Sequence, residues 1–106
     1  MIATVTYPYI VKGDGIPAHL ERQPRLRVAQ IVMDYLAYGW SPEEMCRQHP
    51  YLTIAEAHAA MLYYWDHQAE IDSEIRDEWN QARREHAREL ARHDPFVSRL
   101  RARGVI

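Results

Sequence analysis

The sequence has a single cysteine, Cys46, and no long apolar run among its 106 residues. One cysteine excludes a disulfide within the chain and a zinc site with four cysteine ligands. No apolar stretch approaches the roughly 18 residues of a membrane-spanning helix, and the first residues lack the basic flank and apolar core of a signal peptide. These absences predict a cytoplasmic protein that does not enter a membrane.

Residue patterns that carry metal or catalytic chemistry are also missing. The six histidines show no His-x-x-x-His spacing, and Cys-x-x-Cys is absent, so we expect no metal site. The segment Gly13-Asp14-Gly15 lacks the strand-to-helix context of a phosphate-binding loop. Cys46 has no neighbouring base to activate it, which predicts a buried, unreactive thiol. We therefore expect a protein that is not an enzyme and uses no cofactor.

The charges are unevenly distributed, although the net charge of −2 does not indicate a strongly basic nucleic-acid-binding protein. Residues 1–72 contain five Lys/Arg against nine Asp/Glu, and residues 73–106 contain eight Arg against six Asp/Glu. The hydrophobic share of 47% is enough for a small core. The sequence thus predicts one domain with an acidic body and a mildly basic C-terminal part.

Two short motifs predict corners between helices. The first is a helix-ending glycine followed by a Ser-Pro-x-Glu cap, formed by Gly39, Ser41, Pro42 and Glu44. The second is the capping box Thr53-Ile54-Ala55-Glu56, which follows the helix breaker Pro50. The two corners predict three short helices, with the second from Pro42 to about Gln48 and the third from Ile54 to about Trp65.

These elements predict a mainly α fold of three parts. Residues 1–24 form an N-terminal arm or small β-hairpin, with Gly13-Asp14-Gly15 as the turn. Residues 25–66 form a homeodomain-like three-helix bundle with helix-turn-helix proportions. Residues 67–106 form a long amphipathic helix to about His93, with a tail from Phe96 that orders on binding. The expected core residues at the first corner and in the third helix are Tyr38, Trp40, Ile54, Ala57, Met61, Leu62 and Trp65.

Several segments of the chain, taken in order, resemble those of a known family, the bacterial domain of unknown function 433. They are Arg25-Leu26-Arg27-Val28, Ile31-Val32, Gly39-Trp40-Ser41-Pro42-Glu43-Glu44, His49-Pro50-Tyr51-Leu52-Thr53, Ala59-Ala60, Leu62-Tyr63-Tyr64, His67 and Glu70-Ile71-Asp72. The resemblance covers about half of the chain. It implies the homeodomain-like fold and, for many members, an antitoxin-like role beside a PIN-like ribonuclease toxin.

A DNA-binding role would use the start of the third helix and nearby arginines. The candidate residues are Arg25, Arg27, Arg47, Thr53 and His58. This surface has few positive charges and carries Glu56, so it is a weak DNA reader on its own. The alternative reading is that these arginines are ordinary solvent-exposed residues.

A partner-binding role would use the C-terminal helix, because arginine and tryptophan dominate protein interfaces. The candidate residues are Arg76, Trp79, Arg83, Arg84 and Arg88. A helix that docks on its own domain is the alternative. The leading hypothesis is an antitoxin-like homodimer that binds a PIN-like toxin through this helix and duplex DNA through its body. The second hypothesis is a protein-interaction module that does not bind DNA.

Overall fold

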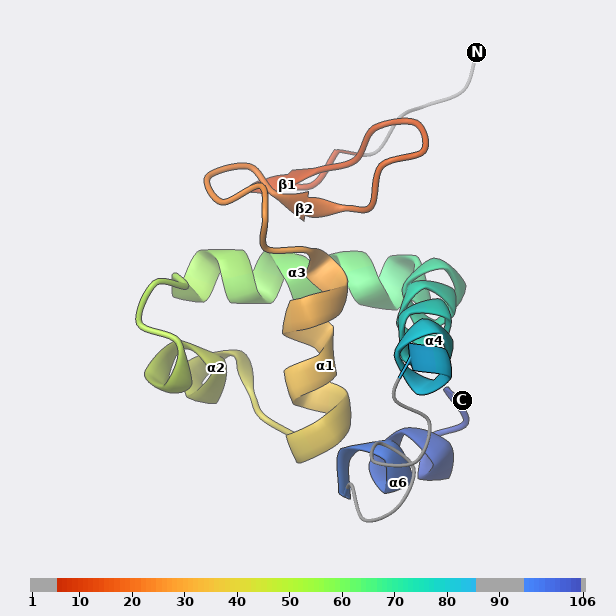
Figure 1. Ribbon diagram of the computed structural model, residues 1–106. Coiled ribbons are helices and arrows are strands. Elements are labelled where there is room, and N and C mark those ends of the chain that lie inside the picture. Colours follow the sequence, from red (N-terminus) through yellow and green to blue (C-terminus); the bar gives the residue numbers. More distant parts are fainter. Residues whose placement is uncertain (1–5, 86–94, 106) are drawn as a thin grey trace.

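The computed structural model describes residues 6–85 and 95–105 of the chain, and side chains except those of residues 95–98 (Figure 1). The described protein is mainly helical, with a small antiparallel hairpin near the N-terminus, as the sequence predicts. Helix α1 lies in the middle of the molecule, with α3 and the hairpin on one side, α2 and α4 flanking it, and α6 at its C-terminal end. This arrangement buries one hydrophobic core.

The predicted hairpin is present and packs on the helices. Strand β1 (Ile10–Val11) pairs with β2 (His19–Leu20), and Ile10 lies opposite Leu20. The turn between them contains a hydrogen bond from the Ile16 N–H to the Gly13 carbonyl (3.2 Å). Because Ala18 and Leu20 are fully buried, the arm is part of the core and covers one side of α3.

Helix α1 (Val28–Tyr38) supplies the centre of the core. Its apolar residues recur at helical spacing, and Val28, Ala29, Ile31, Val32, Leu36 and Ala37 are buried. The helix ends at Gly39, whose φ of 71° is the left-handed conformation that the sequence predicts. The Gly39 N–H donates to the Tyr35 carbonyl at 2.8 Å, which satisfies one of the last carbonyls of the helix.

Helices α2 (Pro42–Gln48) and α3 (Ile54–Asp66) begin at the predicted caps. The Glu44 N–H donates to the Ser41 hydroxyl oxygen at 3.2 Å. The Glu56 N–H donates to the Thr53 hydroxyl at 3.2 Å, and the Thr53 N–H donates to the Glu56 carboxylate at 3.0 Å. Both corners therefore result from local hydrogen bonds that the sequence encodes.

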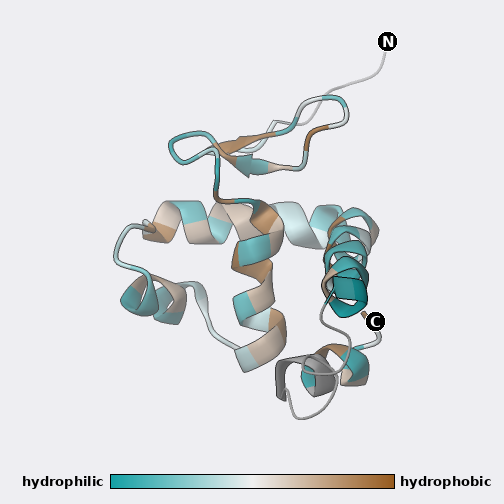
Figure 2. Ribbon diagram, viewed as in Figure 1, coloured by the Kyte–Doolittle hydropathy of each residue, from teal (hydrophilic) through white to brown (hydrophobic). Residues whose placement is uncertain are grey.

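Helix α4 (Gln68–Glu85) is a charged rod with a narrow apolar seam. Figure 2 shows that most of its residues are hydrophilic, yet Ile71 and Ile75 are fully buried against the core. The predicted continuation to about His93 lies outside the described residues. Within the described ranges, no helix combines the length and apolar character needed to cross a membrane.

Residues Pro95–Ala102 form helix α6, in the segment that the sequence predicts to be a tail that orders only on binding. It packs on α1 within the free chain, and the Leu100 side chain is fully buried. The Arg99 guanidinium donates to the Ala37 carbonyl (2.6 Å) at the end of α1. Burial of Leu100 and Val105 stabilises this helix, and such tertiary packing is not visible in local sequence.

Part of the predicted core lies on the surface instead. Tyr38, Ile54, Leu62 and Trp65 are between 45% and 53% exposed, so their assignment to the core was wrong. Ala57 and Met61 are buried as predicted, and the inward side of helix α3 continues through Ala60 and Tyr64. Small alanine side chains let α1 and α3 approach closely, which leaves the larger Leu62 and Trp65 outside.

Candidate functional site

The predicted DNA-binding residue Arg27 is partly buried and held by two carboxylates of the same chain. It lies just before α1, and its guanidinium contacts Glu74 and Glu78 of α4, with an N–O distance of 2.8 Å to Glu78. Burial lowers the pKa of Arg27, but the two carboxylates outweigh burial and the net change is upward. Its charge is therefore used to join α1 to α4 rather than presented to phosphates.

Three other predicted DNA-binding residues also have partners within the chain. Thr53 caps α3 through Glu56, as described above. Arg47 contacts Glu44 on the same helix and remains 68% exposed. The His58 imidazole Nε2 lies 3.7 Å from the Glu43 carboxylate.

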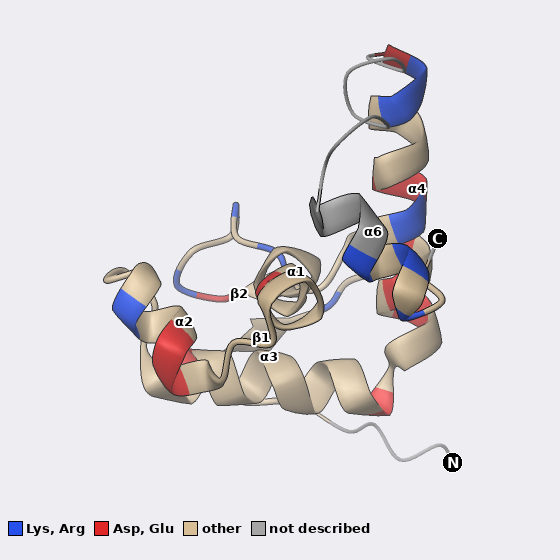
Figure 3. Ribbon diagram, turned by 90° about the horizontal axis from the view of Figure 1, so that it is seen from below, with Lys and Arg blue, Asp and Glu red and all other residues tan. Residues whose placement is uncertain are grey.

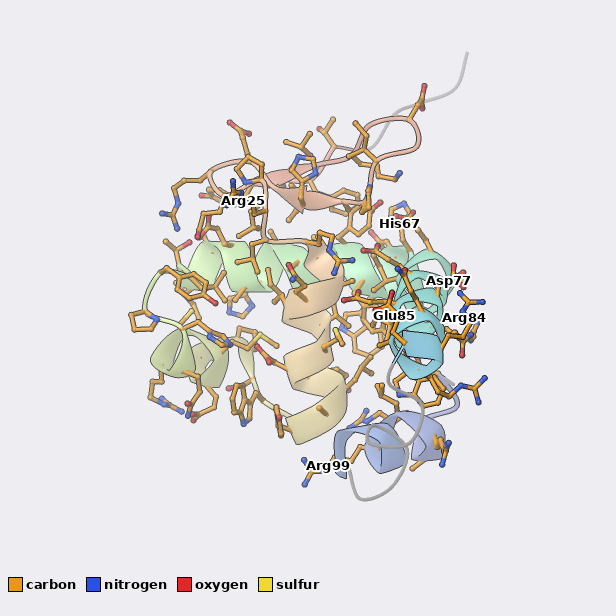
Figure 4. The ribbon with its side chains drawn as sticks, in the orientation of Figure 1. Arg25, His67, Asp77, Arg84, Glu85 and Arg99 are labelled. Atoms are coloured by element: carbon orange, nitrogen blue, oxygen red, sulfur yellow. The ribbon has the colours of Figure 1, made fainter. Side chains whose placement is uncertain are left out.

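The fifth residue, Arg25, lies in the loop that precedes α1 (Figure 4). The five residues thus come from two loops and the helices α2 and α3. In the described parts of the chain, no hydrogen bond or ion pair joins any two of them.

An ion pair that the sequence did not indicate stabilises the start of α3. Arg22 contacts both carboxylate oxygens of Glu56, at 2.8 and 3.2 Å, and it also donates to the Tyr51 carbonyl at 2.7 Å. The hydrogen bonds from Arg22 lower the pKa of Glu56, although burial opposes them. The partners are 34 positions apart in the chain, which explains why no local pattern revealed the pair.

Exposed apolar side chains form a surface between α3 and the end of α1. We call it the aromatic face, and it consists of Tyr35, Tyr38, Trp40, His58, Leu62 and Trp65. All of these residues except Tyr38 line a recess of about 520 Å³. Tyr35 and Trp65 meet edge to face at 5.7 Å, and Tyr38 stacks on Trp40 at 4.8 Å. The sequence contained one signal for this face: positions 54, 58, 62 and 65 are spaced so that they share one side of a helix.

Opposite charges border the aromatic face. Glu43 of α2 lies beside His58 on one edge and is 57% exposed. On the other edge, the guanidinium of Arg99 lies 5.5 Å from the Tyr38 ring, and that of Arg103 lies 5.0 Å from the Tyr35 ring. Figure 3 shows the acidic segment of α2 and the basic segments of α6 on opposite sides of α1.

The predicted partner-binding residues form a second surface on α4 and α6. We define the C-terminal basic surface as Arg76, Trp79, Arg83, Arg84 and Arg101. The guanidinium groups of Arg83 and Arg101 lie over the Trp79 ring at 5.1 and 5.8 Å, and the Arg76 side chain donates to the Val105 carbonyl at 2.7 Å. Figure 4 shows Arg84 on the outer side of α4. Predicted residue Arg88 lies outside the described residues.

Hydrogen bonds from tyrosines of α3 to acids of α4 fix the angle between these helices. The Tyr63 hydroxyl donates to Glu70 and the Tyr64 hydroxyl donates to Asp72, each at 2.8 Å. Tyr7 of the N-terminal arm donates to Asp66 at 2.6 Å, and this hydrogen bond is the main cause that raises the pKa of Tyr7 to about 12. The tyrosines are therefore structural groups.

The described residues contain no arrangement that indicates metal or thiol chemistry. No group of three or more His, Cys, Asp or Glu side chains among residues 6–85 and 95–105 could hold a metal ion. Burial and the nearby carboxylates of Glu43 and Glu56 raise the pKa of the Cys46 thiol, which disfavours the reactive thiolate.

Comparison with known proteins connects the middle of the chain to one family. Residues 20–64 match the family model described as "Protein of unknown function (DUF433)". The matched segment starts in β2, contains both helix corners and ends within α3. No curated protein and no solved structure matched the chain.

Proposed function

Because residues 20–64 are a DUF433 segment, we propose that this chain is an antitoxin-like binding protein of a two-gene pair. In this proposal α1, α2 and α3 form a homeodomain-like body. The C-terminal basic surface binds a PIN-like ribonuclease toxin in the cytoplasm. The protein acts by binding and has no catalytic group of its own.

The observation that carries the proposal is a group of arginines on α4 and α6 that form no ion pair within the described residues. Within the described residues, Arg83, Arg84 and Arg101 form no ion pair, whereas Arg22, Arg27 and Arg47 all do. Cation–π contacts with Trp79 hold Arg83 and Arg101 in place, which lowers the entropy lost when they bind a partner. A surface of preorganised arginines and one tryptophan suits an acidic protein surface.

The body of the protein supports a protein partner better than DNA. The exposed side of α3 presents Ile54, His58, Leu62 and Trp65, and none of these is Lys or Arg. The neighbouring Glu43 would repel phosphates at this position. We therefore propose that α3 does not read DNA.

The experiment is co-expression of the chain with the PIN-like protein encoded by a neighbouring gene. The wild-type chain should relieve the toxicity of that protein and co-purify with it. The double variant Arg83→Glu/Arg84→Glu should weaken the complex by about tenfold or more, because it reverses two charges at the interface. Arg25→Glu is the matched control, since it reverses one exposed arginine in the loop ahead of α1 and should bind as the wild type does.

Two outcomes would contradict the proposal. A wild-type chain that neither relieves toxicity nor forms a complex would refute the antitoxin-like role. Unchanged affinity in the double variant, with an unchanged circular dichroism spectrum, would show that the toxin binds elsewhere on the chain.

A further inference from the structure

The aromatic face described above exposes several large apolar side chains to solvent. Tyr38, Leu62 and Trp65 are 53%, 51% and 52% exposed. Leu62 and Trp65 line the recess, and Tyr38 stacks on Trp40, which also lines it. Soluble monomers rarely expose contiguous apolar patches of this kind, and tryptophan and tyrosine are enriched where proteins associate. This composition favours association of the face with a partner.

The charges that border this face identify the partner. The α2 edge carries Glu43, which is exposed and lies beside His58, and the α6 edge carries Arg99 and Arg103. A two-fold axis that lies in the plane of the face, at right angles to the line from Glu43 to Arg103, brings each edge of one copy against the opposite edge of the other. The acidic edge of each copy then meets the basic edge of its partner, twice in one interface.

From this complementarity we infer that the aromatic face is a two-fold interface between two copies of this chain. Leu62 and Trp65 of both copies form its apolar centre, and Glu43 of each copy lies near Arg103 of the other. Duplex DNA does not fit the same face, because its phosphates would meet Glu43 and the apolar centre.

The interface is separate from the C-terminal basic surface, so dimer formation leaves Arg83 and Arg84 free. The inference also accounts for the recess, which receives side chains of the second copy. Helix α6 has a part in the interface, because it places Arg99 and Arg103 beside the rings of Tyr38 and Tyr35.

Sedimentation equilibrium of the full chain tests the inference. The wild-type protein should be a dimer at micromolar concentrations, and Leu62→Asp should raise the dimer dissociation constant by about 100-fold, because a carboxylate is buried without a partner. Leu62 is half exposed in the single chain, so this change should leave the fold intact, which circular dichroism and thermal melting would verify. Arg25→Glu serves as the control and should dimerise as the wild type does.

A charge exchange makes the test specific for the two-fold geometry. Glu43→Arg alone and Arg103→Glu alone should each raise the dissociation constant by about tenfold, because like charges then meet. An equimolar mixture of the two variants should recover wild-type affinity as a heterodimer, in which both pairs again have opposite charges. Arg103 is the appropriate basic residue for this test, since Arg99 also holds the end of α1.

A monomeric wild-type chain, a dimer that persists in Leu62→Asp, or a mixture that fails to recover affinity would each overturn the inference. These results are independent of the proposed antitoxin-like role. Toxin binding is measured with Arg83→Glu/Arg84→Glu on another surface, and a monomer that still binds the toxin would refute only the dimer.

Discussion

At the scale of single residues, Glu56 carries the most concentrated set of interactions. It is 2% exposed, caps α3 through Thr53 and accepts two hydrogen bonds from Arg22. A buried carboxylate costs free energy unless it is paired and hydrogen-bonded. This network satisfies Glu56 and also joins the loop after β2 to the start of α3.

We expect Glu56→Gln to lower the free energy of unfolding at pH 7 by about 1 to 3 kcal/mol, because it removes the charge that these donors face. Glu44→Gln is the matched control. Glu44 lies at the same position in the cap of α2 but is more exposed, so we expect its loss to stay below about 1 kcal/mol. Urea unfolding of both variants measures the difference.

The pH dependence of this effect follows from the lowered pKa of Glu56 in the folded protein. A depressed carboxylate pKa contributes stability above the ordinary value of 4.5, and this contribution disappears as pH falls through the folded-state pKa. The difference between wild type and Glu56→Gln should therefore shrink below pH 4.5. A constant difference from pH 7 to pH 3 would show that packing, and not charge, stabilises this position.

At the scale of elements, the corner between α1 and α2 depends on one backbone conformation. Gly39 has a φ of 71°, and a Cβ atom at this position would meet no atom within 4 Å. A side chain there would cause backbone strain without a steric clash. The energetic role of Gly39 is therefore purely conformational.

We expect Gly39→Ala to destabilise the protein by about 1 to 2 kcal/mol, the cost of a left-handed conformation for an L-residue. Thermal unfolding followed by circular dichroism measures it. Gly13→Ala is the control, since Gly13 does not have a positive φ and a Cβ would make only an ordinary contact with Ile16. Equal melting temperatures for Gly39→Ala and wild type would contradict this account of the corner.

The elements also show how far the sequence could predict this protein. Caps at Ser41 and Thr53 and the helix end at Gly39 were predictable, because their hydrogen bonds join residues three or four positions apart. Helix α6 and the ion pairs of Arg27 were not, because they depend on partners more than 40 residues away. The aromatic face was misread for the same reason. A helical stripe shows which residues share a side, but only packing shows which side is buried.

At the scale of the whole molecule, charge is distributed unevenly over the fold. The net charge is −2, and the arginines nearest α3 are paired with Glu74, Glu78, Glu44 and Glu56. Arg84 of α4 and Arg99 of α6, which form no ion pair within the described residues, lie well away from Arg25 (Figure 4). Charge on this molecule therefore favours binding at its C-terminal part.

We expect no specific binding of duplex DNA from the region upstream of the gene at about 150 mM salt, because phosphate binding needs several free cations on one face. Mobility-shift assays at two salt concentrations test this. Tight binding that weakens steeply with salt and is lost in Arg47→Glu, with its fold intact, would contradict the prediction. It would show that the ion pair of Arg47 with Glu44 opens to contact phosphates.

The last helix has a practical consequence for anyone who handles this protein. Val105 is buried, and its carbonyl accepts a hydrogen bond from Arg76. An affinity tag or fluorescent reporter fused behind Ile106 would be separated from buried Val105 by Ile106 alone, so it would compete with the docking of α6. Fusions ahead of Met1 avoid this conflict and leave both the aromatic face and the arginines around Trp79 accessible.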